Sequence, residues 1–402
     1  MGMNKSRLTR AILWIALAMG LMTRPAIALP PSTGILLSDE TGQIIYSKNA
    51  DQYFVPASTL KLLISLAALT ELGDNYRYPV YVAYDSESKD LYIKGMGDPL
   101  FISEAIEGLT RNLVQRQNIK EVRHIVLDNS YFETGIEIPG TGNSLNPYDA
   151  TIGALCANFN TLAFKWDDGR REFISAEPQT PLLPGPFMEE VSRSGQSKGR
   201  ILLSPKLQLR YPGELIRHFL NQYGIQVTGG VKAGGFPKNP KDQWTLLSPY
   251  PLPGVVEKLL RYSNNFIANQ LMLTLGAIRE GEPANLAKGQ KLLGDFAAQL
   301  KLGKVNLVEA SGLSRRNRIT PRQMGKLLMA FKPHHGLLRE NGNEFYKTGT
   351  LSDVRSRVGY IKGKDKKLYP FAVFLNGQSK GYENIMADLV KRIQKRPRDK
   401  TD

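Results

Sequence analysis

Residues 56–72 read PASTLKLLISLAALTEL, and this segment organises the rest of the chain. If the segment is helical, apolar side chains cover nearly every side of it. A helix that is apolar all round is typically buried in the centre of a domain. We therefore expect a central helix here, with helices and strands from elsewhere in the sequence packed around it.

Two polar residues stand at the start of this predicted helix. Ser58 and Lys61 are three residues apart, so their side chains share one face. The first turn of a helix is the positive end of its dipole, which disfavours a positive charge, and burial disfavours that charge as well. Both effects lower the pKa of the Lys61 ammonium. A neutral amine beside a hydroxyl can take its proton and create a nucleophile. The alternative is a capping serine followed by a lysine that extends to solvent, and this short pattern alone does not decide between them.

A second polar group follows at Tyr262-Ser263-Asn264-Asn265. In the pattern Ser263-x-Asn265, the hydroxyl can relay a proton and the amide can hold a substrate carbonyl. The shifted pair Tyr262-x-Asn264 is one alternative to this interpretation. A simple turn or helix cap is another, because Ser and Asn are common at both.

The third group is Lys347-Thr348-Gly349-Thr350, at the end of a predicted strand. Lys347 and the Thr348 hydroxyl can bind a carboxylate through charge-assisted hydrogen bonds. Gly349 leaves room for a substrate backbone along the strand edge, and the Thr350 amide can point at a developing oxyanion. Each group alone also fits an ordinary cap, turn or strand end. Together and in this order, the three groups predict one active site.

The flanking sequence predicts one domain built from both ends of the chain. Short apolar runs predict strands before the central helix and again near the C-terminus, where an amphipathic helix follows them. An antiparallel sheet flanked by helices satisfies this pattern, so we expect an α/β (α+β) domain formed by residues 29–75 and 250–395. The predicted strands are Gly34–Ser38, Gln43–Ser47, Glu344–Lys347, Ser356–Lys362 and Tyr369–Leu375.

Residues 76–249 differ from this pattern, because short strand-like runs alternate with turns and with proline-rich or Ser/Gly/Arg-rich loops. They predict a mostly β inserted domain. Its predicted strands are Pro79–Tyr84, Leu91–Lys94, His124–Leu127, Ile201–Leu209 and Ile225–Val231.

The first 28 residues predict export. Basic residues precede an apolar run from Ala11 to Met22, and Ala26-Ile27-Ala28 is typical of a signal-peptide cleavage site. The run is short for a membrane span, although a retained membrane anchor is the alternative. We therefore expect residues 1–28 to be a signal peptide.

Composition and charge narrow the class of protein further. With 402 residues and 42% apolar residues, the chain is long enough for two or three folded units and too apolar to be disordered. A single cysteine, Cys156, excludes a disulfide framework, and the four histidines lack metal-ligand spacing. No metal site is therefore predicted.

The net charge of +16, which falls to +12 without the four basic residues of 1–28, indicates an anionic partner such as a membrane or cell-wall surface. Residues 396–402 form a basic tail that contributes to this charge. Nucleic acid is disfavoured as the partner, because the chain is predicted to be exported and has no aromatic–basic binding pattern.

The three polar groups resemble the S-x-x-K, S-x-N and K-T-G motifs of penicillin-binding proteins and class A β-lactamases. More closely, the chain resembles the serine D-Ala-D-Ala carboxypeptidases and endopeptidases of the penicillin-binding protein 4 type. Gly95-Met96-Gly97-Asp98-Pro99 is similar to that family's G-x-G-D-P, and residues 311–317 are similar to its S-G-L-S-R-x-N. The long interruption between the first two motifs is also typical of the family, and the resemblance runs from about Gly34 to Leu389.

The resemblance implies a transpeptidase-like fold, a role outside the cytoplasm, and peptidoglycan stem peptides as substrates. It also implies covalent inhibition by β-lactams, and no metal or organic cofactor. The Ser-x-Asn form is the more usual companion of K-T-G, which favours Ser263 over Tyr262. The implied catalytic residues are Ser58, Lys61 and Ser263, and the implied substrate-binding residues are Asn265, Lys347, Thr348, Gly349 and Thr350.

The remaining family motifs, at Gly97-Asp98 and at residues 311–317, are expected to be structural turns. Some relatives carry two nested insertions, and residues 76–249 are short for both, so we expect the smaller one to be reduced. The sequence lacks the Glu-x-x-Leu-Asn deacylation motif of class A β-lactamases, which argues against antibiotic hydrolysis. Two alternatives stay open: a wall-binding scaffold that has lost turnover, and a β-lactamase or esterase on the same fold.

Overall fold

The computed structural model describes residues 32–115, 117, 119–142, 149–377 and 382–394. The predicted signal peptide at 1–28 and the predicted basic tail at 396–402 lie outside these residues. Among the described residues, no helix is both long enough and apolar enough to cross a membrane.

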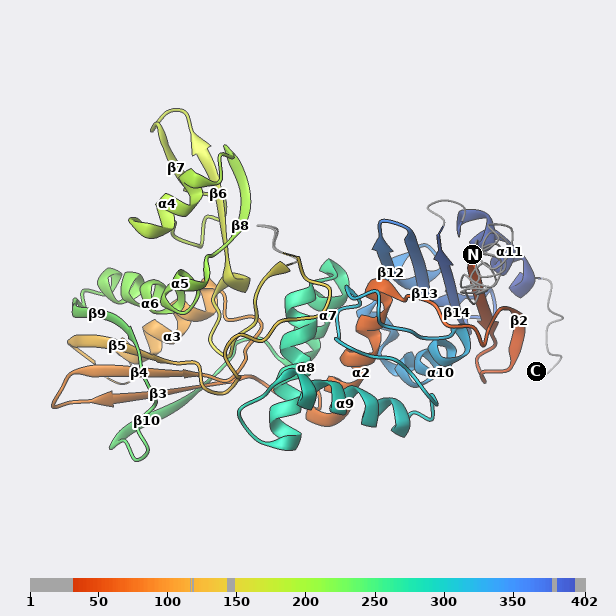
Figure 1. Ribbon diagram of the computed structural model, residues 1–402, viewed down its shortest axis with the longest axis horizontal. Coiled ribbons are helices and arrows are strands. Elements are labelled where there is room, and N and C mark those ends of the chain that lie inside the picture. Colours follow the sequence, from red (N-terminus) through yellow and green to blue (C-terminus); the bar gives the residue numbers. More distant parts are fainter. Residues whose placement is uncertain (1–31, 116, 118, 143–148, 378–381, 395–402) are drawn as a thin grey trace, which may run out of the picture.

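A six-stranded antiparallel sheet joins the two ends of the chain (Figure 1). The first described strand pairs with the last, with Leu36 opposite Ala372. The predicted fold class, an antiparallel sheet flanked by helices, is confirmed. In spatial order the strands are β11 (Arg339–Asn341), β12 (Glu344–Leu351), β13 (Val354–Lys362), β14 (Leu368–Asn376), β1 (Thr33–Ser38) and β2 (Ile44–Lys48).

Strand β14 shows how this sheet is buried on both faces. Its alternate residues point to opposite sides, as the period of a strand requires. Phe371 and Val373 pack with Leu389 of α11 (Tyr382–Gln394), whereas Ala372 and Phe374 face the main core. The C-terminal helix therefore covers one face of the sheet and the central helices cover the other.

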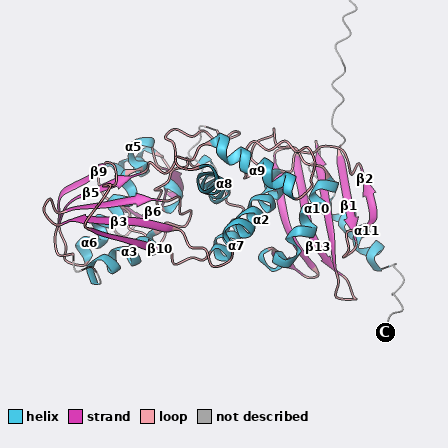
Figure 2. Ribbon diagram, turned by 90° about the horizontal axis from the view of Figure 1, so that it is seen from below, coloured by secondary structure: helices cyan, strands magenta, loops and turns pink. Residues whose placement is uncertain are grey.

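The expected central helix is α2 (Lys61–Leu72), and it follows a single 3-10 turn, η1 (Ala57–Leu60). Every residue from Lys61 to Leu69 is buried. Figure 2 shows α2 among helices between the six-stranded sheet and the inserted residues. These neighbours are α7 (Leu252–Tyr262), α8 (Asn265–Glu280), α9 (Leu286–Gln299) and α10 (Pro321–Phe331).

The inserted residues form two sheets. The larger has the order β10 (Asp242–Leu247), β3 (Pro79–Asp85), β4 (Asp90–Gly95), β5 (Val122–Asp128) and β9 (Val227–Ala233). The smaller has the order β7 (Glu172–Ser175), β6 (Thr161–Asp167) and β8 (Lys198–Leu202). Helices of this part are α3 (Ser103–Gln115), α4 (Pro186–Arg193), α5 (Pro205–Gln208) and α6 (Arg210–Gln222).

The insert contains more helix than its sequence pattern predicted. Strands β4 and β5 pair in parallel, which requires a crossover connection, and α3 provides it. The predicted strand Ile201–Leu209 is wrong beyond Leu202, because the chain there enters α5, with Pro205 in its first turn. Proline is well suited to that position, since its missing N–H has no helical partner there.

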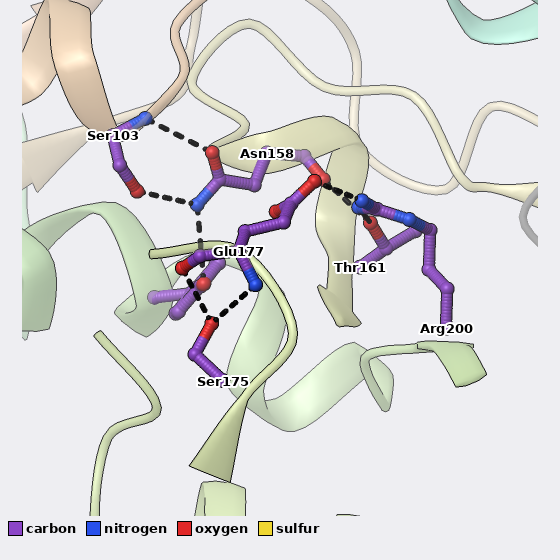
Figure 3. Close-up of polar contacts among 7 residues, drawn as sticks. Ser103, Asn158, Thr161, Ser175, Glu177 and Arg200 are labelled. Carbon is purple, nitrogen blue, oxygen red and sulfur yellow. Dashed lines mark hydrogen bonds and ion pairs between the residues drawn. The ribbon is translucent and has the colours of Figure 1, made fainter. Parts of the chain in front are cut away.

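A polar network joins α3 to the smaller inserted sheet (Figure 3). Asn158 Oδ1 accepts from the Ser103 backbone N–H at 2.9 Å, and Asn158 Nδ2 donates to Ser103 Oγ at 2.9 Å. Arg200 lies on β8. Its Nη1 donates to Thr161 Oγ1 at 2.8 Å, and its guanidinium also pairs with Glu177. These contacts attach α3 to β6 and β8.

The insert also contacts α8, the helix that begins at Asn265. The ring of Phe159 meets that of Phe266 edge to face, with centroids 5.8 Å apart. Farther along α8, Gln270 Nε2 donates to the Gly153 carbonyl at 2.9 Å. The insert is therefore packed against the helix that carries one of the predicted site residues.

Candidate active site

Lys61 lies at the centre of the site, and its side chain is completely buried. Its Nζ lies 2.8 Å from Asn265 Oδ1 and 2.6 Å from the Ser311 carbonyl oxygen, both of which can only accept. The third contact, at 3.0 Å, is to Ser58 Oγ, which can accept or donate. A neutral amine has two N–H groups and one lone pair. With both N–H groups directed at the carbonyl oxygens, the lone pair is left for the Ser58 hydroxyl.

The surroundings of Lys61 favour this neutral form. Burial lowers the pKa of Lys61 well below its ordinary value, because the charged form loses its hydration. The positive charge of Lys347 lowers this pKa further, and the negative charge of Glu309 acts in the opposite direction. The amine can therefore accept a proton at a pH where an exposed lysine is already charged.

Ser263 and Lys347 form the second half of the site. Ser263 lies between α7 and α8 with a φ of 55°, a left-handed conformation that is uncommon for serine and typical of functional turns. Lys347 Nζ donates to Ser263 Oγ at 2.9 Å and to the Thr348 carbonyl at 2.7 Å. The Lys347 side chain is only 4% exposed, and this burial lowers its pKa to about 8.

Two glycines allow neighbouring segments to approach the backbone at Ser58. A Cβ on Gly349 would lie 2.9 Å from the Ser58 nitrogen and 2.7 Å from the Pro56 oxygen. A Cβ on Gly312, where φ is +80°, would lie 1.8 Å from the Ala57 oxygen. Ala57 itself has a φ of 50°. The turn before Ser58 is thus held from two sides, and no larger side chain fits at either glycine.

The predicted residues that remain are at the solvent side of the site. Ser58 is half-buried, and the side chains of Thr348 and Thr350 are exposed on β12. Strand β12 continues to Leu351, so Lys347 lies within the strand and not at its end as predicted. The structure therefore brings Ser58, Lys61 and Asn265 together directly, and links Ser263 to Lys347.

The two possible registers of the second group occupy different environments. Tyr262 is 69% exposed, and Asn264 caps α8 by accepting from the Ile267 N–H at 3.1 Å. Ser263 and Asn265 instead make the contacts to Lys347 and Lys61. The geometry thus favours the pair Ser263 and Asn265.

Sequence reasoning missed two residues of the site, Ser311 and Glu309. Residues 311–317 were expected to be a structural turn, yet the Ser311 carbonyl contacts the Lys61 amine. A backbone carbonyl has no sequence signature, so the contact could not be predicted. Glu309 did offer a signal, since it is an acidic residue in an otherwise uncharged run, residues 305–314.

The other family motif behaves as the expected turn, because Asp98 Oδ1 accepts from the Leu100 N–H at 2.8 Å. Across the part of the chain that the structure describes, no three His, Cys, Asp or Glu side chains are grouped so that they could hold a metal ion.

The fold and these contacts are those expected of a serine peptidase of the penicillin-binding type, and comparison with known families gives the family. The model of the D-Ala-D-Ala carboxypeptidase 3 (S13) family matches residues 22–184 and 191–339. The chain belongs to this family and is a serine D-Ala-D-Ala carboxypeptidase of the penicillin-binding protein 4 type.

Individual relatives agree with this assignment. The D-alanyl-D-alanine carboxypeptidase of Actinomadura sp. (strain R39) is 24% identical over an alignment of 434 positions, which covers 88% of this chain and 79% of that protein. Penicillin-binding protein 4 (dacB) from Haemophilus influenzae has a similar fold, with a TM-score of 0.71, 19% identity, and coverage of 90% of this chain and 97% of that one. A structure of that protein complexed with a β-lactam has a TM-score of 0.65 at 19% identity and covers 88% of this chain and 92% of that one.

Because Lys347 is buried, we expect the active site to lower the stability of the folded protein. A lysine with a pKa of about 8 instead of 10.5 destabilises the folded state by about 3 kcal/mol at pH 7. This penalty is present below pH 8 and disappears as the pH rises through 10.5. We expect Lys347→Met to raise the free energy of unfolding by about 1–3 kcal/mol at pH 7, as measured by urea denaturation.

The matched control is Lys48→Met, at an exposed lysine of β2 in the same sheet, which should change stability by less than about 0.5 kcal/mol. A Lys347→Met protein that is less stable than the wild type at pH 7 would contradict this account.

Proposed function

We propose that Ser58 is the nucleophile of a D-Ala-D-Ala peptidase, with Lys61 as its general base, acting on peptidoglycan stem peptides. The observation that carries this proposal is the set of contacts around Lys61 Nζ. Two carbonyl oxygens take its N–H groups, and the Ser58 hydroxyl lies 3.0 Å away. Loss of the hydroxyl proton to the amine makes the Ser58 oxygen nucleophilic.

The reaction then proceeds through an acyl-enzyme. The Ser58 oxygen attacks the carbonyl carbon between the two D-Ala residues, and the C–N bond breaks. The proton taken by Lys61 reaches the leaving D-Ala nitrogen through the Ser263 hydroxyl. Water then attacks the ester, releases the shortened peptide as a carboxylic acid and restores the Ser58 hydroxyl.

Substrate binding uses the remaining residues of the site. Lys347 and the Thr348 hydroxyl hold the terminal carboxylate of the substrate. Asn265 donates its amide N–H to a substrate carbonyl, while its Oδ1 accepts a hydrogen bond from Lys61. The Ser58 and Thr350 amides stabilise the oxyanion. Gly349 lets β12 lie close to the turn that carries Ser58.

The same machinery serves two related activities. A D-amino cross-link between two stem peptides presents the same kind of carbonyl, so cleavage of cross-links (endopeptidase activity) follows the same steps. A β-lactam ring is also an acyl donor, and we propose that it acylates Ser58 covalently. The relative from Haemophilus influenzae, with a structure described as a β-lactam complex, supports this proposal.

We place this activity outside the cytoplasm, on the periplasmic or cell-wall side. The sequence of residues 1–28 and the family's peptidoglycan chemistry support this location. The net positive charge further favours contact with an anionic membrane or wall surface.

The main alternative is a scaffold on the same fold without turnover. The intact set of motif residues, with the contact between Ser58 and Lys61 in place, argues against it. Release of D-Ala from a pentapeptide separates the two, since a scaffold releases none. A β-lactamase would instead turn over nitrocefin rapidly and would not stop after a stoichiometric burst.

Labelling with a fluorescent penicillin tests the nucleophile. We expect the wild type to be labelled and Ser58→Ala to lose labelling completely, because among the described residues the hydroxyl in contact with the Lys61 amine is that of Ser58. Labelling is read on a denaturing gel, and mass spectrometry places the adduct on the peptide that contains Ser58.

Ser65→Ala is the matched control, because Ser65 is a fully buried serine of the same helix for whose hydroxyl the described residues provide no hydrogen-bond partner. It should be labelled like the wild type. An unlabelled wild type, or a labelled Ser58→Ala protein, would refute the proposal.

The pH dependence of kcat/KM tests the role of Lys347. Binding of the substrate carboxylate requires the charged form of Lys347, with a pKa of about 8, so kcat/KM for D-Ala release should fall as the pH rises through 8. It should also fall at low pH, where Lys61 becomes protonated. With a substrate that ends in a carboxamide, the decline above pH 8 should disappear. A decline that is the same for both substrates would exclude Lys347 as its cause.

A further inference from the structure

Glu309 is a fully buried carboxylate behind the active site. It accepts hydrogen bonds from five donors, all of them uncharged. The donors to Oε2 are the Ser311 backbone N–H at 2.6 Å, Ser311 Oγ at 2.5 Å and Asn269 Nδ2 at 3.4 Å; those to Oε1 are the Ser314 backbone N–H at 3.1 Å and Asn317 Nδ2 at 2.6 Å. Burying a charge without an opposite charge in contact is costly, and so many neutral donors reduce that cost.

The carboxylate reaches the catalytic lysine through one residue, Ser311. The N–H and the hydroxyl of Ser311 both bind Glu309, and the carbonyl of Ser311 accepts from Lys61 Nζ at 2.6 Å. Since the backbone amide and hydroxyl are both fixed, the position of this carbonyl is fixed as well.

Helix α8 holds the same loop from the other side. Asn269 Oδ1 accepts from the Ala310 N–H at 2.9 Å, and Asn269 lies one turn after Asn265. Asn265 provides the second carbonyl oxygen that contacts Lys61. Both acceptors of the lysine N–H groups therefore belong to one hydrogen-bonded unit with Glu309 in its interior.

We propose that Glu309 is a positioning residue for acylation: its buried carboxylate holds the Ser311 carbonyl against the Lys61 amine and balances the positive charge of Lys347 at that amine. This inference rests on the proposed role of Lys61 as the base. Glu309 itself does not touch the reacting atoms, and it acts through Ser311 and through its electric field.

Two charged groups shift the pKa of Lys61 in opposite directions. Lys347, on β12, lowers the pKa of Lys61, whereas Glu309, on the loop before α10, raises it. The other atoms in contact with the amine, from Ser58, Asn265 and Ser311, are uncharged. Removal of the Glu309 charge should therefore lower the pKa of Lys61 and extend its neutral form to lower pH.

The test is the rate of acylation by a chromogenic cephalosporin, measured by stopped flow from pH 4 to pH 9 for the wild type and for Glu309→Gln. We expect the low-pH limb of the Glu309→Gln profile to move to lower pH. The maximal rate should also fall, by up to about a hundredfold, the effect typical of a displacement of about 1 Å at a catalytic group. A purely structural role would lower the rate or the stability without moving the limb.

Glu214→Gln is the matched control. Glu214 is also a buried glutamate, only 4% exposed, but it lies on α6 of the insert and pairs with Arg210 and Arg217. Its low-pH limb should coincide with that of the wild type.

If Glu309→Gln does not fold, Ser311→Ala provides the test. In this variant the backbone N–H and carbonyl of residue 311 keep their contacts to Glu309 and Lys61. The substitution removes one donor from the carboxylate, so the carbonyl of residue 311 is held less firmly against Lys61 and the maximal acylation rate should fall. An unchanged maximal rate for a folded Ser311→Ala protein would overturn the proposal, as would a folded Glu309→Gln protein with an unmoved limb. Failure of the proposed function is distinct, since the wild type itself would then not be acylated.

Discussion

The Lys61 amine is buried, and it lies 3.0 Å from the Ser58 hydroxyl. The surrounding segments hold it in this position and shield it from solvent. An ammonium removed from water loses several kcal/mol of hydration unless it is paired, so the neutral amine is favoured in this position. That preference requires α2 to be apolar on all sides and covered by other helices. It also requires two carbonyl oxygens to take the amine's N–H groups, and α8 and the loop before α10 supply them.

The fold brings distant parts of the sequence to this point. The two ends of the chain share one sheet, and this places β12 beside the turn that carries Ser58. Gly349 and Gly312 permit this approach, because a Cβ at either position would collide with backbone atoms of that turn. Two buried lysines and several left-handed residues are unfavourable for folding, and the large core around α2 offsets them. The buried lysines of the active site therefore cost stability in a domain whose core is well packed.

The sequence allowed much of this to be predicted, for physical reasons that particular residues illustrate. The unbroken apolar runs of α2, β1 and β14 reflect burial, which sequence records directly. The order of the three motifs predicted the residues that converge. The helices of the insert were missed because short apolar runs look alike in strands and helices, as Ile201–Leu209 shows. The roles of Ser311 and Glu309 depend on a backbone carbonyl and on a loop conformation, and neither leaves a periodic pattern in the sequence.

The central claim is that the Lys61 amine loses its proton at a pH well below that of an exposed lysine, and its titration can be observed directly. The protein would be labelled with lysine carrying ¹³C at Cε, and the Lys61 resonance assigned by its absence from the spectrum of Lys61→Met. Burial and the nearby Lys347 predict that this resonance titrates well below the ordinary lysine pKa of 10.5. A Lys61 resonance that titrates near 10.5 or above would contradict the account, because the amine would then be charged whenever the enzyme is active.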